Sequence, residues 1–137
     1  MAEETLVKES LTDRMIEAGA ELTRTLDGAH WPVVASLWFF ESETNQWRLI
    51  LASPAVSEKG PLEAYRHVND ALRASMPTLA LDAISVVSPD DPLIRVLTAA
   101  YQTGSDIKGR RVFRSAINGR FVDDAYVYRL LPIAPAA

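Results

Sequence analysis

The stretch from Val33 to Ala52, VVASLWFFESETNQWRLILA, decides the predicted fold. Its first eight residues are β-branched, aromatic or aliphatic apart from Ser36, which predicts a strand that is covered on both faces and is central in a sheet. The polar segment 42–45 predicts a turn, after which residues 46–52 return as a second strand. The predicted register of this hairpin pairs Phe40 with Trp47, Trp38 with Leu49 and Phe39 with Arg48.

The segment before this hairpin predicts an amphipathic helix that begins at or a little before Ser10 and ends at Gly28. Ser10 and Asp13 stand near the spacing of a capping box, and Gly28 has the conformational freedom that a helix end uses. The apolar side chains recur at steps of three and four residues, which places one stripe of the helix against the sheet: Leu11, Met15, Ala18, Leu22 and Leu26.

Two further helices are predicted after the hairpin, with an irregular stretch following Ser53-Pro54. The first helix begins after Gly60-Pro61 and ends before Pro77, and residues 83–87 then form a short strand. The second helix follows Asp90-Asp91, whose carboxylates suit a helix cap, and ends near Gly104. The inward positions at helical spacing are Leu62, Tyr65, Val68, Leu72 and Met76 in the first helix, with Asn69 as the one polar member, and Leu93, Ile94, Leu97, Ala100 and Tyr101 in the second.

The last third of the chain predicts a second hairpin, because two strand-like runs flank Asn118-Gly119, the dipeptide that suits a type I′ turn. This turn pairs Arg114 with Asp123, and residues 132–137 are expected to fray as a tail. The resulting order α-β-β-α-β-α-β-β predicts an α+β fold in one domain spanning residues 1–137. A five-stranded mixed sheet carries three helices, and both helical connections between strands are expected to be right-handed.

The composition excludes several classes of protein. The chain has no cysteine, which rules out thiolate catalysis, cysteine-ligated zinc and disulfides. The start of the chain is acidic and lacks the apolar run of a signal peptide, and no later run is long enough to cross a bilayer. We therefore expect a cytoplasmic protein without a membrane segment.

No motif in the sequence predicts catalysis or a cofactor. The chain contains two histidines, His30 and His67, too few for a typical catalytic zinc site, so no metal centre is expected. His67 is flanked by Glu63 and Asp70 at helical spacing, which is typical of a solvated pair. The glycines at 104 and 109 have the spacing of a phosphate-binding loop, but they lie between a helix and a strand instead of a strand and a helix.

Charge is unevenly distributed along the chain. The net charge is −4, whereas residues 106–137 carry six Lys and Arg against three Asp and Glu. A basic end on an acidic body either pairs internally or forms an anion-binding face. The candidate binding residues for a small anion are Arg48, Arg111 and Arg114, with Asp123 and Asp124 as acid–base, ligand or metal groups. Nucleic acid is a disfavoured partner because the whole chain is acidic.

The strands carry more large aromatic side chains than one sheet face needs. Either a second subunit covers the surplus or the first helix does so within the chain. The leading functional hypothesis is a small binding or interaction module that self-associates as a homodimer through this aromatic surface. The alternative is an enzyme or receptor for a small anionic ligand. The aromatic residues in question are Trp31, Trp38, Phe40, Trp47, Tyr126 and Tyr128.

Overall fold

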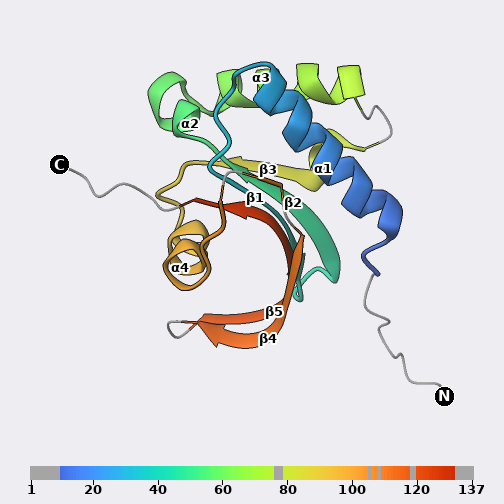
Figure 1. Cartoon of the computed structure of the whole chain (residues 1–137), viewed down its shortest axis with the longest axis vertical. Coiled ribbons are helices and arrows are strands. Elements are labelled where there is room, and N and C mark those ends of the chain that lie inside the picture. The colour runs from blue at the N-terminus through green and yellow to red at the C-terminus, as the bar shows by residue number, and fades with distance from the viewer. Residues whose placement is uncertain (1–9, 76–78, 105, 108, 118–119, 132–137) are drawn as a thin grey trace.

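The computed structural model describes residues 10–75, 79–104, 106–107, 109–117 and 120–131, and for residues 113–117, 120, 121 and 123 it describes the backbone. The elements in this part of the chain follow the predicted order, with a short α-helix and a 3-10 helix in addition (Figure 1). They are α1 (Asp13–Gly28), β1 (Ala35–Glu41), β2 (Gln46–Ala52), α2 (Pro54–Lys59), α3 (Pro61–Ser75), the 3-10 helix η1 (Leu81–Ala83), β3 (Ile84–Val87), α4 (Pro92–Ala100), β4 (Arg110–Ile117) and β5 (Arg120–Leu130).

The strands form one five-stranded sheet in the order β3-β2-β1-β5-β4, so β1 is central as predicted. β1 is antiparallel to both neighbours, whereas β2 and β3 are parallel, which makes the sheet mixed. The α+β class and the five-stranded mixed sheet are therefore confirmed. The first hairpin also has the predicted register, with Phe40 opposite Trp47, Trp38 opposite Leu49 and Phe39 opposite Arg48.

The two helical connections between strands differ. The chain passes from β2 through α2 and α3 to β3, the adjacent parallel strand. In contrast, α4 connects β3 at one edge of the sheet with β4 at the other edge. Because the pairs β2–β1, β1–β5 and β5–β4 are all antiparallel, β4 runs opposite to β3. The right-handed rule covers parallel crossovers, so its application to this second connection was wrong.

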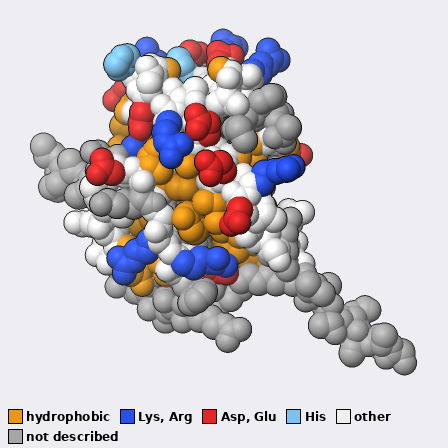
Figure 2. All heavy atoms as spheres, turned by 45° about the vertical axis from the view of Figure 1, so that its right-hand side comes forward, with side chains coloured by type: hydrophobic (Ala, Val, Ile, Leu, Met, Phe, Trp, Pro, Cys, Tyr) orange, Lys and Arg blue, Asp and Glu red, His pale blue; other side chains and the backbone are white. Residues whose placement is uncertain are grey.

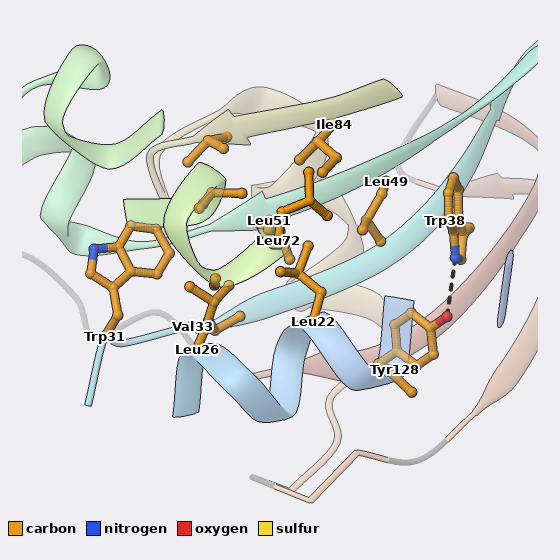
Figure 3. Packing of buried hydrophobic residues seen from close by; sticks show 14 of the residues in the cluster. Leu22, Leu26, Trp31, Val33, Trp38, Leu49, Leu51, Leu72, Ile84 and Tyr128 are labelled. Carbon is orange, nitrogen blue, oxygen red and sulfur yellow. Dashed lines mark hydrogen bonds between the residues drawn. The ribbon is translucent and has the colours of Figure 1, made fainter. Parts of the chain in front are cut away.

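Both faces of the sheet are covered within the chain. α1 and α3 lie on one face, and α4 lies on the other, inside the curve that β4 and β5 form (Figure 1). The first face carries Trp38 and Tyr128 beneath the helices (Figure 3). Trp47 belongs to the same cluster, and each of these three side chains is at most 3% exposed. Of the two alternatives for the strand aromatics, coverage by the first helix, here together with α3, is the one observed.

α1 approaches the sheet closely at Gly19. The Trp38 Nε1 atom donates to the Met15 carbonyl at 3.0 Å, and the Tyr128 hydroxyl donates to the Ile16 carbonyl at 2.5 Å. Nε1 also lies 3.0 Å from the Tyr128 hydroxyl oxygen (Figure 3). A Cβ atom at Gly19 would lie 2.5 Å from that hydroxyl oxygen, so the missing side chain is what allows these hydrogen bonds to form.

The burial of Tyr128 makes the stability of the fold depend on pH in the alkaline range. Burial disfavours the phenolate and raises the pKa of Tyr128 well above its ordinary value of 10.0. The unfolded chain therefore ionises this residue first, so its contribution is constant below about pH 10 and is lost above it, by up to about 1.4 kcal/mol per pH unit. We expect the wild type to lose stability above pH 10 more steeply than Tyr128→Phe in urea unfolding. Parallel curves for the two proteins would contradict this account.

A buried ion pair joins the end of α1 to the end of β5. Arg129 is 5% exposed and donates from Nη1 and Nη2 to the two carboxylate oxygens of Asp27, at 2.9 and 2.7 Å. Nη1 also donates to the Val33 carbonyl at 3.1 Å. A cation at the C-terminal end of α1 is further favoured by the partial negative charge of the helix end. Within the described part of the chain, Arg129 Nε is buried without a hydrogen-bond partner.

The ends of α1 differ from the prediction. The N-cap is Thr12, whose hydroxyl accepts from the Met15 N–H at 3.1 Å, instead of Ser10. Gly28 is the last helical residue, and the left-handed conformation expected there falls on His30, with φ of 62°. His30 N–H donates to the Asp27 carbonyl at 3.0 Å, so a hydrogen bond of the helix end stabilises the unfavourable backbone angle.

Three other details of the prediction were wrong. The stretch after Ser53 is the helix α2, capped by the Ser53 hydroxyl and started by Pro54. Leu62, predicted to face inward, is 73% exposed. α4 ends at Ala100, earlier than the predicted end near Gly104. None of the helices in the described ranges is long and apolar enough to cross a membrane.

Candidate functional site

Two of the predicted site residues, Arg111 and Asp124, form a bidentate ion pair. Arg111 donates from Nε and Nη2 to the two Asp124 carboxylate oxygens at 2.6 and 2.8 Å. The Asp124 side chain is 3% exposed and that of Arg111 is 41% exposed, and the guanidinium lies 5.4 Å from the centre of the Trp47 ring. The hydrogen bond to Asp124 raises the pKa of Arg111. The pair therefore satisfies a buried carboxylate at the end of the aromatic layer.

Arg48 lies on the opposite face of the sheet. Trp47 and Leu49 pack beneath α1 and α3, so Arg48 between them points to the face that α4 covers. Its guanidinium reaches over β3, where Nε donates to the Ser85 hydroxyl at 2.9 Å and Nη1 donates to the Asp82 carbonyl at 3.2 Å. The structure therefore separates Arg48 from Arg111.

Arg114 and Asp123 are placed through the backbone of β4 and β5. The register of the second hairpin puts Phe113 opposite Asp124 and Ser115 opposite Val122. The predicted pairing of Arg114 with Asp123 falls between these two observed pairs, while their side chains and the turn at 118–119 lie outside the described residues. Of the five predicted residues, the structure thus brings together Arg111 and Asp124.

A separate cleft of about 200 Å³ lies between α2, α3 and the loop that follows α1. Its floor is formed by the apolar side chains of Trp31 and Ala64, which are buried at 6% and 1% exposure. Charged side chains stand at its rim, and Figure 2 shows the histidine side chains at one end of the molecule among acidic and basic ones. The residues that line the cleft are Trp31, Pro32, Ala55, Glu58, Lys59, Glu63, Ala64 and His67.

The side chains in the cleft contact one another only loosely. The rings of Trp31 and His67 are stacked with an interplanar angle of 25°, and their centroids are 6.2 Å apart. His67 Nε2 lies 3.5 Å from Glu63 Oε2, and Arg66 Nη1 lies 3.8 Å from Glu63 Oε1. Both distances exceed the 2.7–3.2 Å typical of a strong hydrogen bond. The carboxylate of Glu63 is thus held by weak, exposed contacts, as the sequence predicted for the His67 pair.

Two backbone features build the cleft. After the left-handed His30, the Trp31 N–H donates to the Leu26 carbonyl at 3.0 Å, which turns the indole under α3. Figure 3 shows Trp31 at the end of the buried cluster next to the helices, opposite Trp38 and Tyr128. Gly60, with φ of 90°, then turns the chain from α2 into α3, a conformation that favours glycine.

The sequence-based prediction missed this cleft because it missed α2. Trp31 was counted among the strand aromatics, although it lies in the loop between α1 and β1. The signal for α2 was nevertheless present: Ser53-Pro54 has the same pattern of a capping side chain followed by proline as Asp91-Pro92, which starts α4.

Neither a metal site nor a relative identifies the function of the cleft. Over the described ranges, no group of three or more histidine, aspartate or glutamate side chains is arranged to hold a metal ion. Comparison of the chain with protein-family models, with curated proteins and with solved structures finds no match in any of the three.

Proposed function

We propose that the protein is a small binding module and that the cleft between α2, α3 and Trp31 is its binding site. The observation that carries this proposal is the buried Trp31 indole at the floor of a cleft whose rim is charged. Binding sites for small groups typically combine an apolar floor with a few polar groups that fix orientation. The cleft volume of about 200 Å³ suits one side chain or a fragment-sized molecule.

The exposed leucine of α3 does not extend this site. Leu62 is 73% exposed and directly precedes Glu63, but consecutive residues of a helix point about 100° apart. The α3 residues that line the cleft are Glu63, Ala64 and His67, and their side of the helix is nearly opposite to that of Leu62. The proposal therefore rests on the cleft itself.

The other sequence-based hypotheses receive less support. Of the arginines predicted for an anionic ligand, Arg48 and Arg111 lie on opposite faces of the sheet, and the bidentate contact with Asp124 already offsets much of the charge of Arg111. Self-association was predicted through the strand aromatics, and of these Trp38, Phe40, Trp47 and Tyr128 are buried within the chain. A homodimer remains a prediction that would need another surface.

A panel of small probes tests the proposed site. We expect at least one of n-butanol, phenol, n-butylammonium chloride and sodium butyrate to shift the Trp31 indole N–H signal saturably in a 15N-labelled sample. The indole signals of Trp38 and Trp47, which are buried away from the cleft, serve as internal controls. Absence of a saturable Trp31 shift with every probe would remove the proposed function.

A cleft-filling variant identifies the site independently. Ala55→Met should abolish the Trp31 shift because the longer side chain occupies the cleft that Ala55 lines. Ala99→Met on the exposed side of α4 is the matched control and should leave the shift unchanged. Equal binding by both variants would place the probes elsewhere on the protein.

A further inference from the structure

We infer that the cleft binds a basic side chain of a partner peptide, with the cationic head between Glu58 and Glu63 and the hydrocarbon stem on Trp31. This inference rests on the proposed function and adds the chemical class of the occupant. It follows from the charges at the rim, the weak contacts of the carboxylates and the aromatic floor.

The charges that line the cleft favour a cation. Glu58 and Glu63 contribute two negative charges, and Lys59 contributes one positive charge. An anionic occupant would add a third negative charge beside the two carboxylates, whereas the positive charge of an ammonium or guanidinium group would lie between the two negative ones. Charge complementarity therefore selects a basic partner.

The carboxylates of Glu58 and Glu63 are available for a stronger ion pair than the contacts that the structure shows for them. The Glu63 contacts of 3.5 and 3.8 Å involve His67 and Arg66 side chains that are 49% and 65% exposed. Glu58 is exposed, and in the described part of the chain it takes part in no ion pair. A cation bound between them would form charge-assisted hydrogen bonds at shorter distances, about 2.7–2.9 Å.

The floor of the cleft suits the rest of a lysine or arginine side chain. These residues bury their methylene stems on apolar surface and keep the charged head in water. Trp31, Pro32 and Ala55 supply such a surface. A cation near an indole is also attracted by the negative face of the ring.

The nearby helix ends do not reverse this preference. The N-terminus of α3 carries a partial positive charge that on its own would favour an anion. The negative charge of Glu63 in the first turn of α3 already offsets this partial positive charge. The C-terminus of α2, which carries a partial negative charge, directly precedes α3 in the chain. The full charges at the rim therefore decide the class of occupant.

Three tripeptides that differ in one side chain test the inference. They are acetyl-Gly-Lys-Gly-amide, its norleucine analogue, which keeps the stem and removes the charge, and its glutamate analogue. We expect the lysine peptide to shift the Trp31 indole N–H signal with an affinity about fivefold higher than the norleucine peptide, as for a partly exposed ion pair. The glutamate peptide should bind most weakly.

Charge-removing variants assign the preference to the two carboxylates. In Glu58→Gln combined with Glu63→Gln, the lysine peptide should bind no better than the norleucine peptide, whose own affinity should be unchanged. Both substitutions are at exposed or half-buried positions, so the fold is preserved. Glu43→Gln in the turn between β1 and β2 removes a carboxylate far from the cleft in sequence and should keep the lysine preference.

The outcomes separate this inference from the proposed function. If the norleucine or glutamate peptide binds as well as the lysine peptide, the cleft is a binding site but its occupant is not a cation. If the probe panel shifts Trp31 and none of the peptides does, a peptide side chain is the wrong occupant. If neither panel nor peptides shift Trp31, the proposed function itself fails.

Discussion

Asp27→Asn is expected to lower the free energy of unfolding by about 3 kcal/mol, because it leaves the guanidinium of Arg129 buried without a counter-charge. The Arg129 side chain is 6% exposed, so water replaces the lost carboxylate only in part. The expected loss is at the lower end of the range for a broken buried pair, since the Asp27 side chain itself is 39% exposed. Urea unfolding measures the difference.

An exposed pair on the same helix is the matched control. Glu21→Gln removes the contact with Arg24, whose side chain is 54% exposed, and should change the stability by less than about 1 kcal/mol. If Asp27→Asn is as mild as Glu21→Gln, the buried pair does not hold the end of α1 to β5.

Gly19→Ala is expected to destabilise the protein by about 3 kcal/mol, although alanine is the better helix former by about 1 kcal/mol. The new Cβ would meet the Tyr128 hydroxyl oxygen at 2.5 Å and Trp38 Nε1 at 2.8 Å. Both rings are fully buried, so they cannot move aside without opening the core. α1 must therefore shift away from the sheet and weaken its hydrogen bonds to both side chains.

A second glycine of α1 provides the control for this prediction. A Cβ at Gly28 would have no atom within 4 Å, and this residue has an ordinary negative φ. Gly28→Ala should therefore be neutral or stabilising by up to about 1 kcal/mol. Equal stability of Gly19→Ala and the wild type would show that the close approach of α1 is not tightly packed.

The parts of the fold that the sequence predicted are those fixed by local pattern. A predicted turn of four residues gave the register of β1 and β2, and a predicted two-residue turn at Asn118-Gly119 gave that of β4 and β5. Helix stripes at three- and four-residue steps located α1 and α3. α2, with six residues, is too short for such a stripe to develop.

The parts that the sequence did not predict depend on contacts between distant segments. The order of strands follows from the pairing of β1 with β5, which no local sequence pattern near Ala35 or Leu130 indicates. The ion pair between Asp27 and Arg129 joins residues 102 positions apart. The prediction for the connection from β3 to β4 was wrong for the same reason, because the direction of β4 depends on the pairing of β1 with β5.

The candidate site shows the same division. The sequence correctly placed His67 beside Glu63 as an exposed pair, because both lie on one helix at a spacing of four residues. It could not place Trp31 beneath that pair, since the indole reaches α3 through the turn at His30. The predicted arginines, in turn, were separated by strand alternation, which puts Arg48 and Arg111 on opposite faces.

Binding in the cleft is the central claim, and contacts between bound probe and protein test it most directly. Intermolecular nuclear Overhauser effects should connect the methylene protons of n-butylammonium with the Trp31 and His67 rings and the Ala55 methyl group, which line the cleft together. Contacts confined to another surface, such as Tyr126 beside Arg111, would contradict the claim.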